Sequence, residues 1–209
     1  MKIASDAWMF VIPLLLGGGI VYATGYRGAS LVFIALALFV MFFFRDPERE
    51  IPQDANGIVS PADGTIVRID HDWLDDSTGE KKTRVSIFLS IFNVHINRYP
   101  IAGKVIKKEF INGKFLAAFN HMASEENSRT VVVIDTPYGK VTIKQIVGLI
   151  ARRIVCSTNV GDTVAKGERF GLMRFGSRMD VIFPSTAEVK VKLKDKVQGG
   201  ISTIAILAK

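Results

Sequence analysis

Two long apolar stretches at the N-terminus constrain this chain more than any other feature. Residues 7–26 contain no charged side chain, Arg27 interrupts, and residues 28–44 are again free of charge. A membrane-spanning helix needs about 20 apolar residues, with about 17 as the lower limit, and both stretches reach that range. Residues 25–28, Gly-Tyr-Arg-Gly, have the composition of a turn. Residues 1–44 are therefore predicted to form a hydrophobic membrane anchor of one or two helices, as a helical hairpin.

A cleaved signal peptide is the alternative for this segment, since Lys2 supplies a charged start. The second apolar stretch argues against cleavage, because it follows the first like a stop-transfer signal. Arg45 and Arg49 come directly after it, and positive residues beside a span favour the cytoplasmic side. We therefore expect the chain at the cytoplasmic membrane with its remaining domain on the cytoplasmic face, whether the anchor spans or is re-entrant.

Residues 45–209 are predicted to form a single compact domain of the β-rich α+β class. Short runs rich in β-branched residues alternate with turn signals such as Asp63-Gly64 and Asn112-Gly113. The predicted strands are residues 65–69, 84–90, 131–135, 140–147, 181–183, 189–194 and 201–207. Residues 189–194 alternate apolar and lysine side chains most regularly, which predicts one buried face and one solvated basic face.

Helices are expected to be few in this domain. Residues 115–127 are the best candidate, and no helix is expected between successive strands, so a doubly wound sheet is not predicted. Residues 160–168 have the pattern strand, tight turn, strand, and they resemble a turn of lipoyl- and biotinyl-type barrels. Lipoyl/biotinyl-barrel-like elements are therefore part of the predicted fold. No GxGxxG or P-loop pattern is present, so nucleotide binding has no support.

The charge and cysteine content narrow the classes of partner. Lys and Arg number 27 against 20 Asp and Glu, a formal net charge of +7, which suits nucleic acid, acidic substrates or anionic lipid. A single cysteine, Cys156, excludes an intramolecular disulfide framework and a multi-cysteine zinc site. The 3 histidines are scattered, so no metal site is expected.

Three segments contain the residue types that activate a hydroxyl: Asp63, His95 and Ser177. A serine is a weak nucleophile until a base takes its proton, and imidazole is the usual base near neutral pH. A carboxylate can orient that imidazole. Each residue taken singly is more often structural, so these residues alone predict only a membrane-anchored β-rich domain with a candidate serine-dependent activity.

Six ordered segments, taken together, resemble phosphatidylserine decarboxylase of the short prokaryotic type. They are residues 43–49, 60–64, 93–98, 123–127, 145–148 with 151–155, and 171–178. The resemblance implies an inactive proenzyme that cuts itself by serinolysis between Gly176 and Ser177, into a β chain of residues 1–176 and an α chain of residues 177–209. It implies that Ser177 becomes a pyruvoyl group, the covalent cofactor, with no metal and no pyridoxal phosphate.

The implied reaction converts phosphatidylserine to phosphatidylethanolamine through a Schiff base with the pyruvoyl ketone, as a step of phospholipid biosynthesis. His95 is then the expected base for self-cleavage and acid for reprotonation, and Asp63 would orient it. Longer family members carry a second histidine three residues after the first, where this chain has Arg98. The expected Asn-Glu-Arg motif reads Asn-Ser-Arg at residues 127–129. Arg98 and Arg129 are predicted as weak substrate contacts.

The expected partners are phosphatidylserine, anionic membrane lipid, and the β and α chains of one proenzyme, with a homo-oligomer left open and no nucleic acid. An anchor would keep the site at its lipid substrate and avoid extracting acyl chains, at about 0.8 kcal/mol per CH₂. Three alternatives remain: a membrane-anchored serine peptidase, a non-catalytic lipoyl-like adaptor, and, within the family, archaetidylserine or another serine phospholipid as substrate.

Overall fold

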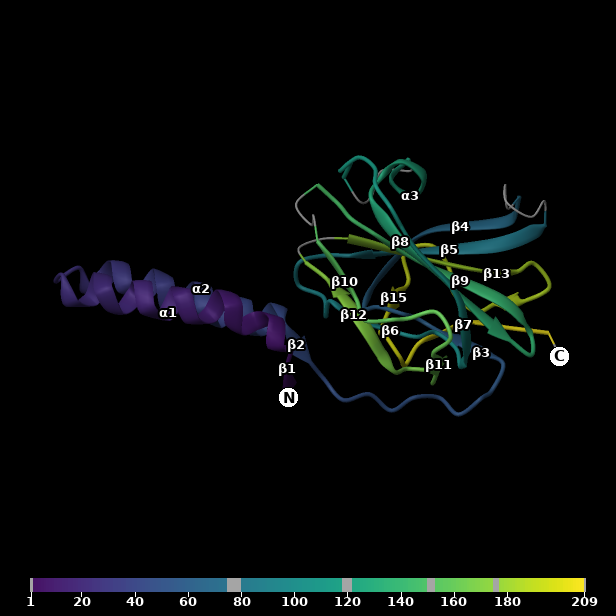
Figure 1. Ribbon diagram of the computed structural model, residues 1–209, viewed down its shortest axis with the longest axis horizontal. Coiled ribbons are helices and arrows are strands. Elements are labelled where there is room, and N and C mark those ends of the chain that lie inside the picture. The colour runs from purple at the N-terminus through teal and green to yellow at the C-terminus, as the bar shows by residue number, and fades with distance from the viewer. Residues whose placement is uncertain (1, 75–79, 118–121, 150–152, 175–176, 209) are drawn as a thin grey trace. The chain divides into compact units, whose positions relative to one another are not determined.

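The computed structural model describes residues 2–74, 80–117, 122–149, 153–174 and 177–208. The chain divides into two units, Met1–Glu48 and Arg49–Lys209. The first unit is helical and the second is built almost entirely of strands (Figure 1). Gly176, one side of the predicted cleavage site, lies outside the described residues.

The first unit is a pair of apolar helices joined by a short turn. Its elements are β1 (Lys2–Ile3), the 3-10 helix η1 (Ser5–Ala7), α1 (Trp8–Ala23), α2 (Arg27–Phe43) and β2 (Arg45–Asp46). The helices pack closely at Gly18, where an added Cβ would lie 2.9 Å from the Cβ of Phe33. Strands β1 and β2 pair antiparallel and close the hairpin at its base.

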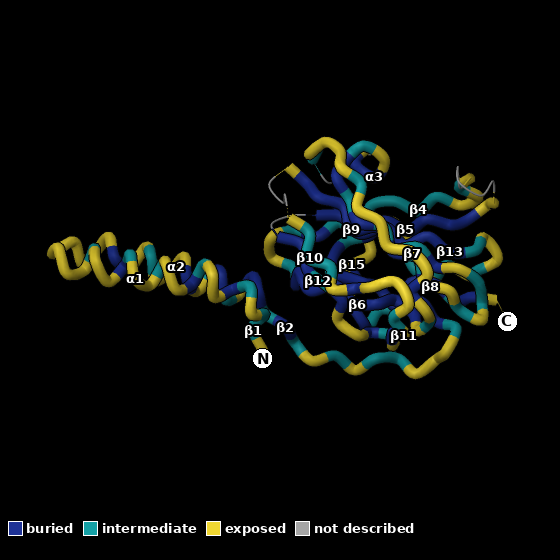
Figure 2. The backbone as a smooth tube through the Cα atoms, viewed as in Figure 1, coloured by how far each residue is buried: buried dark blue, intermediate teal, exposed yellow. Residues whose placement is uncertain are grey.

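Apolar side chains cover the outside of this helix pair. Leu16, Ile20 and Leu31 are each more than 60% exposed, and exposed residues recur along both helices in Figure 2. Large apolar surfaces of this kind mark contact with protein or lipid. Among the described helices, the segment Ser5–Ala23 has the length and apolar composition to cross a membrane, while Arg27–Phe43 is shorter.

The second unit is organised by one large sheet, which has eight strands within the described residues and curls into a half-barrel (Figure 1). All its pairings are antiparallel, in the order β11-β7-β8-β9-β13-β5-β4-β15. The strands are β4 (Gly64–Leu74), β5 (Lys81–Leu89), β7 (Gly103–Ile111), β8 (Arg129–Thr136), β9 (Gly139–Ile146), β11 (Thr163–Val164), β13 (Ser177–Pro184) and β15 (Lys196–Val197).

The two faces of this sheet differ in chemistry. Met179, Val181 and Phe183 of β13 point to the face that forms the hydrophobic core with the two smaller sheets. Successive side chains of a strand alternate between faces, so Asp180 and Ile182 lie on the other side, which we call the second face. Cross-strand partners share a face, so the second face can be followed from strand to strand through the register.

Within the described residues, two three-stranded sheets and one short helix complete the unit. One sheet has the order β10-β12-β6 and the other β14-β16-β3. Their elements are β6 (Ile96–Arg98), β10 (Ile154–Cys156), β12 (Arg169–Met173), β3 (Gly57–Val59), β14 (Glu188–Val189) and β16 (Thr203–Ile206), and the helix is α3 (Ala123–Glu126). The β-rich prediction is confirmed, with most predicted strands in place.

Two of the local predictions are wrong. The described part of residues 115–127 is helical only at α3, because Asn127 Nδ2 and Oδ1 bond the backbone of Leu116 and hold that stretch extended. The predicted strand 189–194 is strand only at Val189. A turn ends the alternation, since the Lys192 amide donates to Asp195 and Lys194 has a φ of 74°.

Candidate functional site

The segments that hold Asp63, His95 and Ser177 converge at one end of three neighbouring strands. Ser177 begins β13 and lies opposite Leu89, the last residue of β5. Asp63 directly precedes β4, whose second residue pairs with Phe88. Because β5 runs antiparallel to both neighbours, the starts of β4 and β13 and the end of β5 share this edge. The sheet register therefore gathers segments more than 100 residues apart.

Ser177 is completely buried at the first position of β13. The alternation along the strand places its side chain on the same face as Met179. Its Oγ atom makes no hydrogen bond to any described residue. A buried hydroxyl without a partner costs about 1–3 kcal/mol, so its presence needs a reason other than stability.

His95 lies beside the end of β12, which leads toward Ser177. It is 2% exposed, and its backbone carbonyl accepts from the Met173 amide at 3.4 Å. Nδ1 of the ring is 2.9 Å from the carbonyl oxygen of Asn93. A carbonyl oxygen only accepts, so Nδ1 carries the proton and Nε2 of the neutral ring is the basic nitrogen. This tautomer suits a general base.

Asp63 is held by a cation and a backbone amide. Both of its carboxylate oxygens accept from Arg49 Nη2, at 3.1 and 2.9 Å, and Oδ1 also accepts from the Gly199 amide at 2.7 Å. In the described part of the chain no hydrogen bond joins it to His95. Asp63 and Asn93, whose carbonyl orients His95, instead line one cavity of about 500 Å³.

Replacing Asp63 with asparagine is expected to lower the free energy of unfolding by about 1.5–3 kcal/mol, the range for hydrogen bonds to charged groups. The Arg49 and Asp63 side chains are only 10% and 14% exposed, so water replaces the lost carboxylate poorly. Urea unfolding measures the change, with Asp54→Asn, whose side chain is 40% exposed, as the matched control. Equal stability of the two variants would contradict this account of Asp63.

The two arginines predicted as substrate contacts lie in different surroundings. Arg98 is 6% exposed, and its Nη1 donates to the Gly167 carbonyl at 2.9 Å. Arg129 Nη1 donates to the carbonyls of Glu125 and Asn127, while its Nε is buried without a hydrogen-bond partner among the described residues. Arg129 pairs with Ile146, and Ile146 pairs with Arg178, so Arg129 belongs to the second face.

A buried ionic network directly after Ser177 was missed by sequence reasoning. Arg178 is 1% exposed, and its Nε donates to Asp180 Oδ1 at 2.8 Å. Its Nη2 donates to Ser86 Oγ on β5 at 2.6 Å, and Ser124 Oγ of α3 donates to Asp180 Oδ2 at 2.7 Å. The network therefore ties the start of β13 to its neighbouring strand and to α3.

The charge of Asp180 depends on this network. Burial opposes ionisation of the carboxyl, but the nearby Arg178 and the hydrogen bonds from Ser124, Arg178 and Ser86 outweigh it, so the pKa of Asp180 is lowered. Alternating Arg and Asp at residues 178 and 180 would ordinarily indicate a solvated strand face. The only sequence signal for the network was thus ambiguous.

Other residues of the six family-like segments hold the backbone around this edge. Asn127 is fully buried, and its Nδ2 donates to the carbonyls of Leu116 and Val147. Gln145 Nε2 donates to Asn97 Oδ1 at 2.9 Å, which joins β9 to β6. Among the described residues, no group of three His, Cys, Asp or Glu side chains could hold a metal ion.

Comparison with known proteins places this arrangement in a family. The family model described as phosphatidylserine decarboxylase matches residues 36–205. A phosphatidylserine decarboxylase proenzyme of Geobacter metallireducens is 40% identical, with 98% of this chain and 96% of the relative covered. Proenzymes of the same name from Chlorobium chlorochromatii and Ralstonia nicotianae are 46% and 42% identical, over 85% and 98% of this chain and 82% and 95% of the relatives. The chain therefore belongs to the phosphatidylserine decarboxylase family.

Proposed function

We propose that this protein decarboxylates phosphatidylserine to phosphatidylethanolamine after cutting itself between Gly176 and Ser177. The observation that carries the proposal is the buried Ser177 hydroxyl, which has no described hydrogen-bond partner and begins the strand that the α chain would start with. Such a hydroxyl does not stabilise the fold. Its presence is explained if Ser177 is the residue that reacts during self-cleavage. Family membership supplies the reaction class.

Self-cleavage would proceed through the side chain of Ser177. Its Oγ attacks the carbonyl carbon of Gly176, and an ester replaces the peptide bond. Loss of the Ser177 α-proton then eliminates the ester, so that residue 176 leaves as a carboxylate and residue 177 becomes dehydroalanine. Tautomerisation and hydrolysis, with one water consumed and one ammonia released, leave a ketone at residue 177. The products are chains of 176 and 33 residues.

His95 is the proposed proton carrier in both stages. With Nδ1 fixed on the Asn93 carbonyl, Nε2 takes the proton of Ser177 during cleavage and returns a proton to the substrate carbon after carbon dioxide leaves. The pyruvoyl group supplies the electron sink for that loss. Asp63 would position the Asn93 segment across their shared cavity, and Arg98 is proposed as a contact for the anionic head group.

The first unit is proposed to hold the enzyme at its lipid substrate. In this proposal residues 1–44 are the anchor, residues 45–209 are the catalytic domain, and the site faces the cytoplasm, in keeping with Arg45 and Arg49 after the second apolar stretch. The tight turn at Gly161, with a φ of 99°, supports lipoyl-like elements in residues 160–168.

Intact mass of the purified protein tests the cleavage. We expect two chains, the smaller starting at residue 177 and resistant to Edman degradation because its first residue has no amine. The same sample should release carbon dioxide from phosphatidylserine and form phosphatidylethanolamine. An active preparation made of one uncut chain would overturn the proposal.

The alternatives give different results in the same measurements. A serine peptidase or a lipoyl-like adaptor predicts an intact chain that retains Ser177. The proposed site recognises the serine head group, which both lipids carry. An assay of archaetidylserine beside phosphatidylserine at equal concentration therefore shows which of the two lipids is the better substrate.

A further inference from the structure

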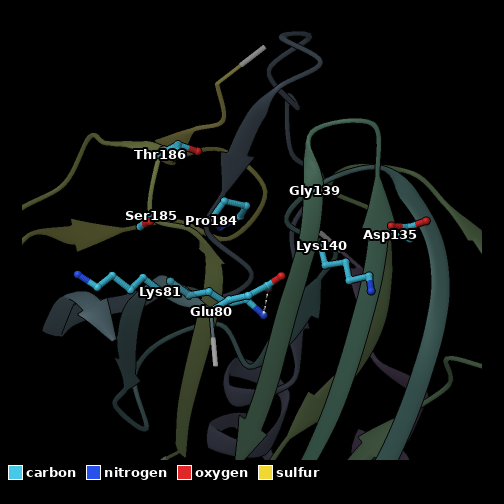
Figure 3. Close-up of a pocket in the computed structure, with 9 residues that line it drawn as sticks. Glu80, Lys81, Asp135, Gly139, Lys140, Pro184, Ser185 and Thr186 are labelled. Carbon is cyan, nitrogen blue, oxygen red and sulfur yellow. Dashed lines mark ion pairs between the residues drawn. The ribbon is translucent and has the colours of Figure 1, made fainter. Parts of the chain in front are cut away.

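Two adjoining cavities open on the second face of the large sheet, where α3 does not cover it. One, of about 390 Å³, lies over β7, β8 and β9, and the other measures about 470 Å³. Lys82 and Lys140 line both. Figure 3 shows the second cavity, with Pro184 between the side that holds Lys81 and the side that holds Lys140.

Cations dominate the lining of the first cavity. Its charged residues are Lys82, Lys107, Arg129, Lys140 and Lys144, against the single acid Glu109. Lys107 is paired with Glu109 at 2.8 Å, and Glu109 therefore already neutralises one of these cations. Within the described residues neither Arg129 nor Lys140 has an acidic side chain within ion-pair distance, and Arg129 Nε is a buried donor without a partner.

Lys144 is also incompletely neutralised at this place. Its side chain is 11% exposed, and the nearest described carboxylate, that of Glu125, is 3.8 Å away. Burial lowers the pKa of Lys144, although the carboxylates of Glu125 and Asp180 act in the opposite direction. A negatively charged ligand would offset the cost of keeping this ammonium out of water.

An apolar floor lies beside these cations. Ile106, Val131, Val133 and Ile182 line the first cavity, and Trp73 lines it as well. Trp73 also contacts the cationic groups, with Lys144 Nζ 5.3 Å and Arg84 Cζ 5.0 Å from its ring centroid. A cationic cavity that continues over β-branched side chains fits a ligand with one anionic head and an acyl chain, whereas free phosphate would leave the floor in contact with water.

We propose that the second face binds an anionic phospholipid of the bilayer, with its phosphate between Arg129 and Lys144, which the β8–β9 register places side by side, and an acyl chain over Val131 and Val133. This site is distinct from the reaction centre, because the Ser177 side chain lies on the other face of the sheet. The inference goes beyond decarboxylation and does not depend on it, although Arg129 then serves a phosphate here rather than at Ser177.

Trp73 is a built-in reporter for this site. The chain has 2 tryptophans, so Trp8→Phe leaves Trp73 as the single emitter in the full-length protein. The protein is placed in phosphatidylcholine nanodiscs with rising fractions of phosphatidylglycerol that carries dibrominated acyl chains. Phosphatidylcholine with the same brominated chains is the control for contact without a net charge on the lipid, and glycerol 3-phosphate is added as the head group without chains.

We expect saturable quenching by the brominated phosphatidylglycerol that exceeds quenching by brominated phosphatidylcholine at least about two-fold, since each nearby cation favours anionic lipid by about five-fold in affinity. Glycerol 3-phosphate should not reverse it. Lys144→Met should raise the phosphatidylglycerol fraction needed for half-saturation about five-fold, and Val133→Glu should abolish the excess, while the exposed Lys192→Met serves as matched control.

Equal quenching by the two lipids, or quenching unchanged in both Lys144→Met and Val133→Glu, would overturn the site. So would reversal by glycerol 3-phosphate alone, which would identify a phosphate site without a lipid chain. Conversion of phosphatidylserine is measured in the same nanodiscs. Loss of quenching with conversion intact would mean that only the lipid site is wrong. Quenching that persists in an uncut, inactive chain would mean that only the proposed function is wrong.

Discussion

Ser177→Ala is expected to remain a single 209-residue chain without decarboxylase activity. Alanine has no oxygen to attack the Gly176 carbonyl, and loss of a catalytic nucleophile costs about 10⁶-fold in rate. The substitution removes a buried hydroxyl that has no described partner, so the fold should keep its stability or gain about 1 kcal/mol. Denaturing electrophoresis and intact mass report cleavage, and urea unfolding reports stability.

Ser157→Ala is the matched control for this experiment. Ser157 Oγ donates to the Phe170 carbonyl at 2.9 Å, so its loss should cost about 1 kcal/mol of stability and leave cleavage intact. Of the two variants, Ser177→Ala is thus expected to be the more stable and yet inactive, and Ser157→Ala the less stable and yet active. A Ser177→Ala protein that still separates into two chains at the same bond would exclude Ser177 as the nucleophile.

Much of the fold was predictable because turn signals and β-branched runs are local. The strands around residues 65–69, 84–90 and 131–135 are present as β4, β5 and β8. Residues 189–194 were the most regular pattern and yet are mostly not strand. Val189 and Val191 pack against the core as the pattern predicts, but the Lys192–Asp195 turn then redirects the chain toward its pairing partner β4.

The residues of the site could be predicted from the sequence, but their arrangement in space could not. Ser177 and His95 were identified from short motifs, while their approach depends on the antiparallel register of β13, β5 and β4 and on the Met173–His95 contact. These pairings join distant parts of the chain, and no local pattern encodes them. The partners of Asp63, which are Arg49 and Gly199, were hidden for the same reason.

The Arg178–Asp180 pair shows that a polar sequence pattern on a strand does not reveal whether its residues are buried. Polar residues two apart on a strand ordinarily face water, but here Asp180 is fully buried, and Ser124, 56 positions earlier, donates a hydrogen bond to it. The same second face carries the cations proposed to hold lipid. The side of the sheet away from the core is thus not a plain solvated surface, and its charges are assigned to structural and binding roles.

Asp180→Asn is expected to lower the free energy of unfolding at neutral pH by about 3–5 kcal/mol, the cost of removing one partner of a buried ion pair. The amide keeps a similar shape but removes the carboxylate charge that faces the Arg178 guanidinium, on an arginine side chain that is 1% exposed. Arg178→Lys should also destabilise, because one ammonium replaces the separate donors to Asp180 and Ser86. Urea unfolding in the Trp8→Phe background, followed through Trp73, measures both.

The pH dependence separates this charge effect from a change of packing. The pKa of Asp180 is lowered in the folded state, so its contribution to stability is complete above the ordinary aspartate pKa of about 4 and is lost as pH falls through the lowered folded value. The stability gap between the parent protein and Asp180→Asn should therefore be constant from pH 6 to 8 and shrink below about pH 4. Asp135→Asn, an exposed position on β8, should show little change. A gap of the same size at every pH would mean that the carboxylate charge is not what holds β13 in place.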